Sequence, residues 1–177
     1  MKHQVYLSFG SNTGHRAALM QQAIKQIGLA VGKVVRTSRF IETAPWGFVS
    51  EHQFLNACIC VETTLSPRQV LEATQRIERQ LGRERKSENG VYHDRPIDID
   101  ILLFDDMHIN EPDLVIPHPL MLERDFVMIP LREILPTPRR SESARPIAGA
   151  ACPLGASCAR FRRGAYTRVR CNDGRAH

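Results

Sequence analysis

The sequence predicts an α+β fold in which two helices pack on one face of an antiparallel sheet. Four segments show the period-two alternation or the β-branched content of strands, and two segments repeat apolar residues every three to four positions, as amphipathic helices do. Their order is strand, helix, strand, strand, helix, strand. This βαββαβ order is that of a ferredoxin-like sandwich, in which the first and last strands are neighbours, and we expect the last strand to lie mid-sheet.

The first strand and the first helix are predicted near the N-terminus. Residues 3–9 alternate apolar and polar side chains and end at residues 10–12, Gly-Ser-Asn, which we expect to form a turn in the wall of a pocket. Residues 14–31 have helical periodicity. The N-cap is expected at residue 12 or 13, and Gly32 is expected to end the helix.

Two further strands are expected in residues 33–42 and 53–63, which are rich in β-branched residues. The long loop between them carries Trp46, the only tryptophan of the chain. Loops of this length often carry functional residues. The second helix starts at residues 66–69, Ser-Pro-Arg-Gln, where Ser is a good N-cap, Pro a good first helical residue and Gln the partner of a capping box. We expect this helix to reach Gly82.

The last strand of the predicted sheet covers residues 97–104, and two aspartates directly after it are expected to end it. A loop is expected from Pro112 to Pro119. The apolar segment 121–135 is expected to be helical, with Pro130 kinking or ending it.

A pair of carboxylates marks this last strand. Apolar and acidic residues alternate in residues 97–101, so Asp98 and Asp100 share one face. Carboxylates beside a basic segment predict a site for a metal ion and a polyphosphate. The alternative is that both aspartates form the solvated face of an amphipathic strand. The basic residues before the strand are Arg83, Arg85, Lys86 and Arg95.

Length and composition indicate one ordinary globular domain. The chain has 177 residues, of which 42% are hydrophobic and 24% charged. It has no long apolar segment and no secretory leader, so we expect a cytoplasmic protein with no membrane partner. The five cysteines lack the spacing of a zinc site, and their odd number favours reduced thiols.

The basic charge belongs to the C-terminal segment. Residues 1–136 contain 15 Lys and Arg and 17 Asp and Glu, a net charge of −2, whereas residues 137–177 contain nine Arg and two acids, a net charge of +7. The tail is rich in Ala, Gly, Ser and Pro and has no structural periodicity. We therefore expect a domain in residues 1–136 and an atypical, disordered Arg-rich tail in residues 137–177. A reading-frame shift after Pro136 would explain the change of composition, and an added arm that binds nucleic acid is the competing explanation.

Several segments resemble the 6-hydroxymethyl-7,8-dihydropterin pyrophosphokinase family of folate biosynthesis, over residues 3–136. The acidic strand with the arginine before it is the most specific of them. The matching segments are Gly10-Ser11-Asn12, Phe54-Leu55-Asn56-Ala57, Gln75-Arg76-Ile77-Glu78, Gly82-Arg83, residues 95–102 (RPIDIDIL), Pro117-His118-Pro119 and Arg124.

The resemblance implies an ATP- and Mg²⁺-dependent diphosphotransferase. Members transfer the pyrophosphoryl group of ATP to the hydroxymethyl group of the dihydropterin and release AMP. By resemblance, Asp98 and Asp100 hold two Mg²⁺ ions, and Arg83 and Arg95 act as catalytic residues on the transferred phosphoryl groups. Replacing either aspartate by alanine is expected to remove activity with little loss of fold.

The resemblance also assigns the residues that bind each substrate. The pterin is expected between two aromatic rings, with polar groups reading its edges. The residues expected to bind ATP are Gln75, Glu78, Arg85, Lys86, Ile101, His118 and Arg124. The residues expected to bind the pterin are Thr43, Ala44, Trp46, Phe54, Asn56 and Phe126.

The sequence allows two alternatives to an active enzyme. One is a ferredoxin-like RNA-binding module with a basic tail, which requires aromatic residues on the exposed sheet face, where this sequence places acids. The other is an inactive family member whose C-terminus is frame-shifted. We expect a monomer whose partners are ATP and hydroxymethyldihydropterin, and nucleic acid is not expected as a partner.

Overall fold

The computed structural model describes residues 1–47, 50–83 and 94–136, and the predicted tail lies outside this part of the chain. No helix in the described part is long and apolar enough to cross a membrane. The strands are β1 (His3–Ser11), β2 (Gly32–Thr37), β3 (Ile41–Thr43), β4 (Phe54–Thr63), β5 (Asp98–Phe104), β6 (Ile109–Glu111) and β7 (Leu114–Ile116). The helices are α1 (Arg16–Ala30), α2 (Pro67–Gln80), the 3₁₀ helix η1 (Met121–Glu123) and α3 (Asp125–Ile134).

The main sheet has the strand order β2-β4-β1-β5, and β3 pairs with β4 as well. All of its pairings are antiparallel. The α+β ferredoxin-like prediction is therefore confirmed, including the pairing of the first strand with the aspartate strand. The mid-sheet position predicted for that strand is wrong: β1 pairs on both sides, whereas β5 has only β1 as a strand partner among the described residues.

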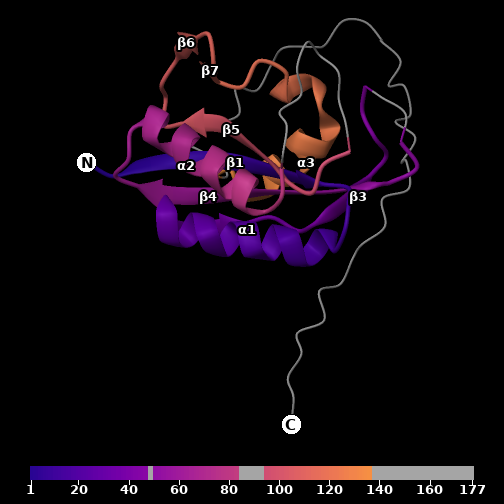
Figure 1. Cartoon of the computed structure of the whole chain (residues 1–177). Coiled ribbons are helices and arrows are strands. Elements are labelled where there is room, and N and C mark those ends of the chain that lie inside the picture. Colours follow the sequence, from indigo (N-terminus) through magenta and orange to yellow (C-terminus); the bar gives the residue numbers. More distant parts are fainter. Residues whose placement is uncertain (48–49, 84–93, 137–177) are drawn as a thin grey trace, which may run out of the picture. The chain divides into compact units, whose positions relative to one another are not determined.

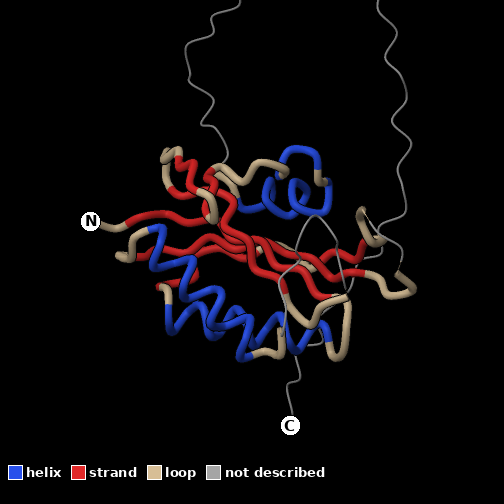
Figure 2. Tube along the Cα trace, turned by 45° about the horizontal axis from the view of Figure 1, so that its top comes forward, coloured by secondary structure: helices blue, strands red, loops and turns tan. Residues whose placement is uncertain are grey.

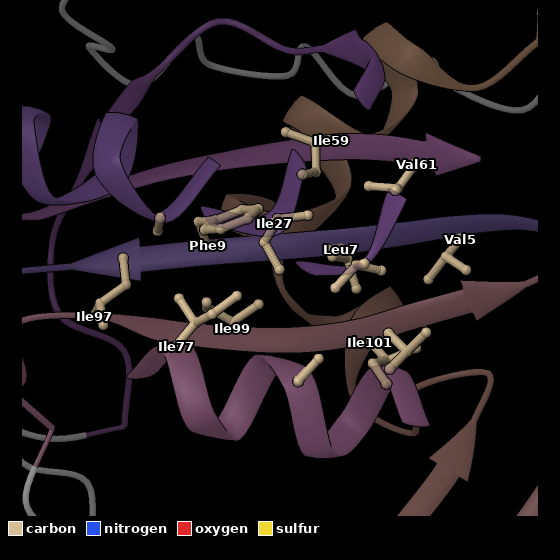
Figure 3. Packing of buried hydrophobic residues seen from close by; sticks show 14 of the residues in the cluster. Val5, Leu7, Phe9, Ile27, Ile59, Val61, Ile77, Ile97, Ile99 and Ile101 are labelled. Carbon is tan, nitrogen blue, oxygen red and sulfur yellow. The ribbon is translucent and has the colours of Figure 1, made fainter. Parts of the chain in front are cut away.

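Helices cover both faces of the sheet. The two predicted helices, α1 and α2, lie on one face, as expected, and α3 lies on the other (Figure 1, Figure 2). The face toward α1 and α2 forms the larger core, whose side chains interdigitate as Figure 3 shows. This core follows from strand alternation, because every second residue of a strand points to the same side. Its members include Val5, Leu7, Phe9, Ile99 and Ile101.

The face toward α3 forms a second, smaller core. Strand β4 is almost continuously buried because it contributes to both cores. The two cysteines of the domain, Cys58 and Cys60, belong to this second core as free thiols, which agrees with the reduced state predicted from the sequence. The other buried members of this core are Tyr6, Leu102, Met121, Val127, Leu131 and Ile134.

Local signals predicted the start of α2 but not that of α1. Ser66 and Gln69 form the expected capping box, with the Ser66 N–H donating to Gln69 Oε1 at 2.8 Å. Helix α1 begins after His15 without a side-chain cap, so the predicted cap at residue 12 or 13 is wrong. Gly32 follows the end of the helix, as predicted. Glycine is required at this position because a Cβ would collide with the carbonyl oxygen of Glu62.

The region after β5 is more structured than predicted. The expected loop contains β7, which pairs with β6, the strand directly before the loop, in a hairpin that forms a separate small sheet. The predicted helical segment is η1 followed by α3, and α3 continues through Pro130 to Ile134. The strand predicted over residues 33–42 is divided into β2 and β3, both of which pair with β4.

Candidate active site

Two pockets meet at the acidic end of β5. The first encloses about 520 Å³ and the second about 1260 Å³, counting the open mouth of each. Four side chains line both pockets, so they form a shared wall. These are Arg95, Asp98, Asp100 and Arg124.

The first pocket contains all six residues that the sequence predicted around the pterin. Thr43, Ala44 and Trp46 come from β3 and the loop after it, Phe54 and Asn56 from β4, and Phe126 from α3. The resemblance did not assign the other lining residues. The alternation of β1, which places Ser8 and Gly10 on one face, could have indicated these two residues. The additional lining residues are Ser8, Phe9, Gly10 and Val127.

Asn56 is fixed in this pocket by its neighbours. Its Nδ2 donates to Thr43 Oγ1 at 2.8 Å. Gly10 lies opposite Asn56 in the strand register, and a Cβ on Gly10 would lie 3.2 Å from Asn56 Oδ1. Glycine at this position therefore leaves room for the amide, which can present a donor and an acceptor to a flat heterocycle.

Guanidinium groups lie against the aromatic walls. The Trp46 and Phe126 ring centroids are 6.2 Å apart. The Arg124 guanidinium carbon lies 4.8 Å from the Trp46 centroid and 5.8 Å from that of Phe126, and the Arg95 guanidinium carbon lies 5.8 Å from the Phe54 centroid. These distances are those of cation–π contacts. The cations of the shared wall are thus held beside the apolar pocket.

The second pocket contains every predicted ATP-binding residue that the structure describes. These residues are Gln75 and Glu78 of α2, Ile101 of β5, His118 and Arg124. Arg85 and Lys86 lie outside the described residues. Sequence reasoning missed the contribution of the hairpin, since a two-residue turn between three-residue strands gives little periodicity to detect. The additional lining residues are Leu71, Ile99, Pro112, Asp113, Leu114, Val115, Pro119 and Leu120, together with the predicted catalytic Arg83.

Asp98 is the centre of an ion-pair network. Its carboxylate pairs with Arg83 and, at 3.0 Å, with Nη2 of Arg95. Arg83 pairs with Glu78 as well. The structure thus joins the two predicted catalytic arginines to the predicted metal ligand. The expected small loss of fold takes no account of these contacts, because Asp98→Ala would leave both guanidinium groups without this carboxylate.

Glu78 has a structural partner that the resemblance did not indicate. It is 4% exposed, and its Oε1 accepts the backbone N–H of Ile99 at 2.8 Å. Strand β5 ends the strand order, so no strand in the described part of the chain pairs with this outward N–H, and the carboxylate accepts it instead. Burial raises the pKa of Glu78, and Arg83 opposes the shift.

Asp100 is a carboxylate whose ionised form is disfavoured by its surroundings. Burial, followed by the charge of Asp98, raises the pKa of Asp100 to about 7, although Arg95 and Arg124 oppose the shift. A bound divalent cation would reverse this effect, because positive charge favours the ionised carboxylate. The oxygen chemistry of the aspartate pair fits Mg²⁺. Within the described part of the chain, no group of three or more His, Cys, Asp or Glu side chains is placed to hold a metal ion.

His118 enters the second pocket as a neutral hydrogen-bond donor. Its backbone N–H donates to Leu102 O at 3.0 Å, and its Nδ1 accepts the Leu120 N–H at 3.2 Å. The ring proton therefore resides on Nε2. Burial, followed by the charge of Arg124, lowers the pKa of His118, which favours the neutral ring.

Asn12 anchors the backbone of Arg95. Its Oδ1 accepts the Arg95 N–H at 2.8 Å, its own backbone N–H donates to Arg95 O at 3.2 Å, and its Nδ2 donates to Asp94 Oδ1 at 2.6 Å. Asn12 follows β1 and is 2% exposed. This role could not be predicted from the sequence, because the partners are more than eighty positions apart.

Comparison with known proteins gives one consistent family. Residues 6–136 match the family model described as 7,8-dihydro-6-hydroxymethylpterin-pyrophosphokinase (HPPK). A 2-amino-4-hydroxy-6-hydroxymethyldihydropteridine pyrophosphokinase of Porphyromonas gingivalis is 51% identical over 133 residues, which are 75% of this chain and 90% of that protein. The protein of the same name in Bacillus subtilis is 41% identical over 135 residues, 76% of this chain and 79% of that protein.

Solved structures show the same fold. A crystal structure of an HPPK-DHPS in complex with substrates matches with a TM-score of 0.62 and 15% identity, and one of Plasmodium falciparum HPPK-DHPS with a TM-score of 0.60 and 18% identity. The matches cover 75% and 77% of this chain but only 40% and 42% of those longer chains. Because the family model spans most of the chain and a relative that is 51% identical matches over three quarters of it, the chain belongs to the 7,8-dihydro-6-hydroxymethylpterin-pyrophosphokinase family.

Proposed function

We propose that this chain transfers the pyrophosphoryl group of ATP to the hydroxymethyl oxygen of 6-hydroxymethyl-7,8-dihydropterin, with Mg²⁺, in folate biosynthesis. The observation that carries the proposal is the wall shared by two pockets of different character. Transfer between two substrates requires their reacting groups to meet, and the shared wall supplies both cations and carboxylates at that meeting point.

The first pocket takes the pterin. Its aromatic walls suit a flat ring, and the amide of Asn56 suits the alternating donors and acceptors along the edge of a pterin. The second pocket takes ATP, with Gln75, Ile101 and His118 in its lining and the arginines of the shared wall near the phosphates. Both pockets are built from one chain, so we propose that a monomer is sufficient.

In the reaction, the hydroxymethyl oxygen attacks the β-phosphorus of ATP. The bond from that phosphorus to the oxygen bridging the α- and β-phosphates breaks, AMP leaves with this oxygen, and the hydroxyl proton passes to solvent or to a phosphate oxygen. Arg83 and Arg95 neutralise charge that spreads over the transferred group. Asp98 and Asp100 would hold Mg²⁺, which would supply charge neutralisation and orientation of the phosphate oxygens.

The test is a product assay on the purified full-length chain with Mg-ATP and hydroxymethyldihydropterin. We expect AMP and the pterin diphosphate in equal amounts, and no AMP when either the pterin or Mg²⁺ is withheld. ADP as the only nucleotide product would refute pyrophosphoryl transfer, and turnover that survives removal of Mg²⁺ by EDTA would refute the metal requirement.

A further inference from the structure

A stripe of side chains runs along one face of α2. Arg68, Leu71, Gln75 and Glu78 follow one another at three- and four-residue spacing, so they share this face. The last three line the second pocket, whereas Arg68 is in the first turn of the helix. Arg68 therefore continues a wall of the second pocket beyond its lining residues.

The guanidinium of Arg68 connects this wall to the hairpin. It pairs with Glu111, the last residue of β6, and with Asp113 in the turn, so that the two carboxylates flank Pro112. A hairpin with strands of three residues is only marginally stable alone, and the position of its turn depends on contacts outside it. One side of the hairpin is held by the buried Leu114.

The turn that Arg68 holds is part of the second pocket. Pro112 and Asp113 line it together with the first two residues of β7. Without Arg68, the carboxylate of Asp113 would remain at the pocket without this partner and would repel an anion such as a nucleotide. A single guanidinium thus fixes the opposite wall of the pocket and neutralises charge beside it.

We propose that Arg68 is a positioning residue for the nucleotide: it ties the β6–β7 turn to α2 and thereby sets the spacing of two walls of the second pocket. This inference rests on the proposed function, in that the second pocket receives ATP. It assigns Arg68 no contact with the reacting groups. The loss of Arg68 should therefore affect nucleotide affinity and leave the chemical step and the pterin pocket unchanged.

Binding of Mg²⁺ with the non-reactive analogue α,β-methylene-ATP tests this assignment. Two exposed ion pairs acting together support an expected loss of about 5-fold in analogue affinity for Arg68→Ala. The KM for ATP should rise in parallel, whereas kcat and the KM for the pterin should stay constant. Arg68→Lys keeps the charge without the two-pronged geometry, so its analogue affinity should lie between those of the wild type and Arg68→Ala. An unchanged analogue affinity in Arg68→Ala, or an equal rise in the KM for the pterin, would overturn the proposal.

Arg39→Ala is the matched control. Arg39 is also exposed and also makes a two-pronged pair with a carboxylate, that of Glu133, but neither residue lines the second pocket. We expect its analogue affinity to equal that of the wild type. A loss equal to that of Arg68→Ala would show that any exposed ion pair matters, and would overturn the assignment.

Hydrogen exchange separates this proposal from the proposed function. In the ligand-free protein, the backbone amides of residues 109–116 should exchange faster in Arg68→Ala than in the wild type or Arg39→Ala. Equal exchange would overturn the tether whatever the nucleotide does. If Arg68→Ala exchanges faster as expected, but the wild-type chain binds no analogue and forms no AMP, the tether stands and the proposed function is overturned.

Discussion

At the scale of single residues, alternation along one strand was enough to place Asp98 and Asp100 together, and both line the shared wall. Their different surroundings could not be predicted. Asp98 pairs with two guanidinium groups, whereas burial and the charge of Asp98 raise the pKa of Asp100. The hydrogen bond from the Ile99 N–H to Glu78 could not be predicted either, because this N–H is available only where β5 ends the strand order.

This difference predicts unequal effects of Asp98→Ala and Asp100→Ala. Both should abolish AMP formation. In EDTA, Asp98→Ala should lower the free energy of unfolding by about 3 kcal/mol, since it breaks a mostly buried pair from one side. Asp100→Ala should leave it unchanged or raise it, because like charges no longer oppose each other. Urea unfolding measures both values, and equal destabilisation by the two substitutions would contradict the ion-pair network described for Asp98.

Asn12 supports a second prediction at this scale. Asn12→Asp places a carboxylate against that of Asp94 and should lower kcat by about 10-fold to 100-fold by displacing Arg95. Adding Asp94→Asn restores a donor for the new carboxylate, and kcat should recover. Exposed Asn110→Asp is the control and should have no effect. A double variant as slow as the single one would count against the anchoring of Arg95.

At the scale of elements, strong local signals gave the right answer and weak ones did not. The Ser-Pro-Arg-Gln segment predicted the start of α2 to the residue, whereas the helix ends at Gln80, before the predicted Gly82. The β6–β7 hairpin was not predicted, and its turn and β7 fall in the expected loop, because strands of three residues show almost no alternation. The hairpin is stabilised by burial of Leu114 and Ile116 in the larger core. Helix α3 continues through Pro130 because its packing in the second core outweighs the proline.

The link between α3 and the segment after β2 predicts a pH effect. The carboxylate of Glu133 accepts hydrogen bonds from the backbone N–H of Arg39 at 3.0 Å and from Arg39 Nε at 3.0 Å. These hydrogen bonds lower the pKa of Glu133. A carboxyl whose pKa is lowered by folding stabilises the fold at pH values above its ordinary, unfolded pKa. This stabilisation is lost as the pH falls through the pKa of the folded protein. Glu133→Gln should therefore cost about 0.5 to 1 kcal/mol at pH 7, a range set by the partial exposure of the pair.

The measurement is the free energy of unfolding as a function of pH. The wild type and Glu133→Gln should converge at pH values below the pKa of the folded carboxyl. A difference that stays constant down to pH 3 would mean that packing, rather than the charge of Glu133, causes it.

At the scale of the whole molecule, the order of elements and the family resemblance predicted the architecture, most of the lining of the first pocket and about half of the lining of the second. The error was the position of β5, which ends the strand order instead of lying inside it. The boundary at residue 136 stays a prediction. Among the residues that the structure describes, both cores are drawn from residues 5–135.

A chain that ends at Pro136 should therefore keep the fold and the activity. We expect its melting temperature to lie within about 3 °C of the full-length value, and its rate of AMP formation to be equal. Differential scanning calorimetry and the AMP assay, run on both chains, measure this. Loss of activity in the shorter chain would show that the tail takes part in the function.

The wall shared by the two pockets makes the two binding equilibria interdependent. A ligand in one pocket changes the charge and the side-chain freedom that Arg95, Asp98, Asp100 and Arg124 offer to the other. Cooperativity of this kind is reciprocal: the factor by which the pterin changes the dissociation constant of the nucleotide equals the factor by which the nucleotide changes that of the pterin. The affinity of this chain for either substrate is therefore a property of the pair.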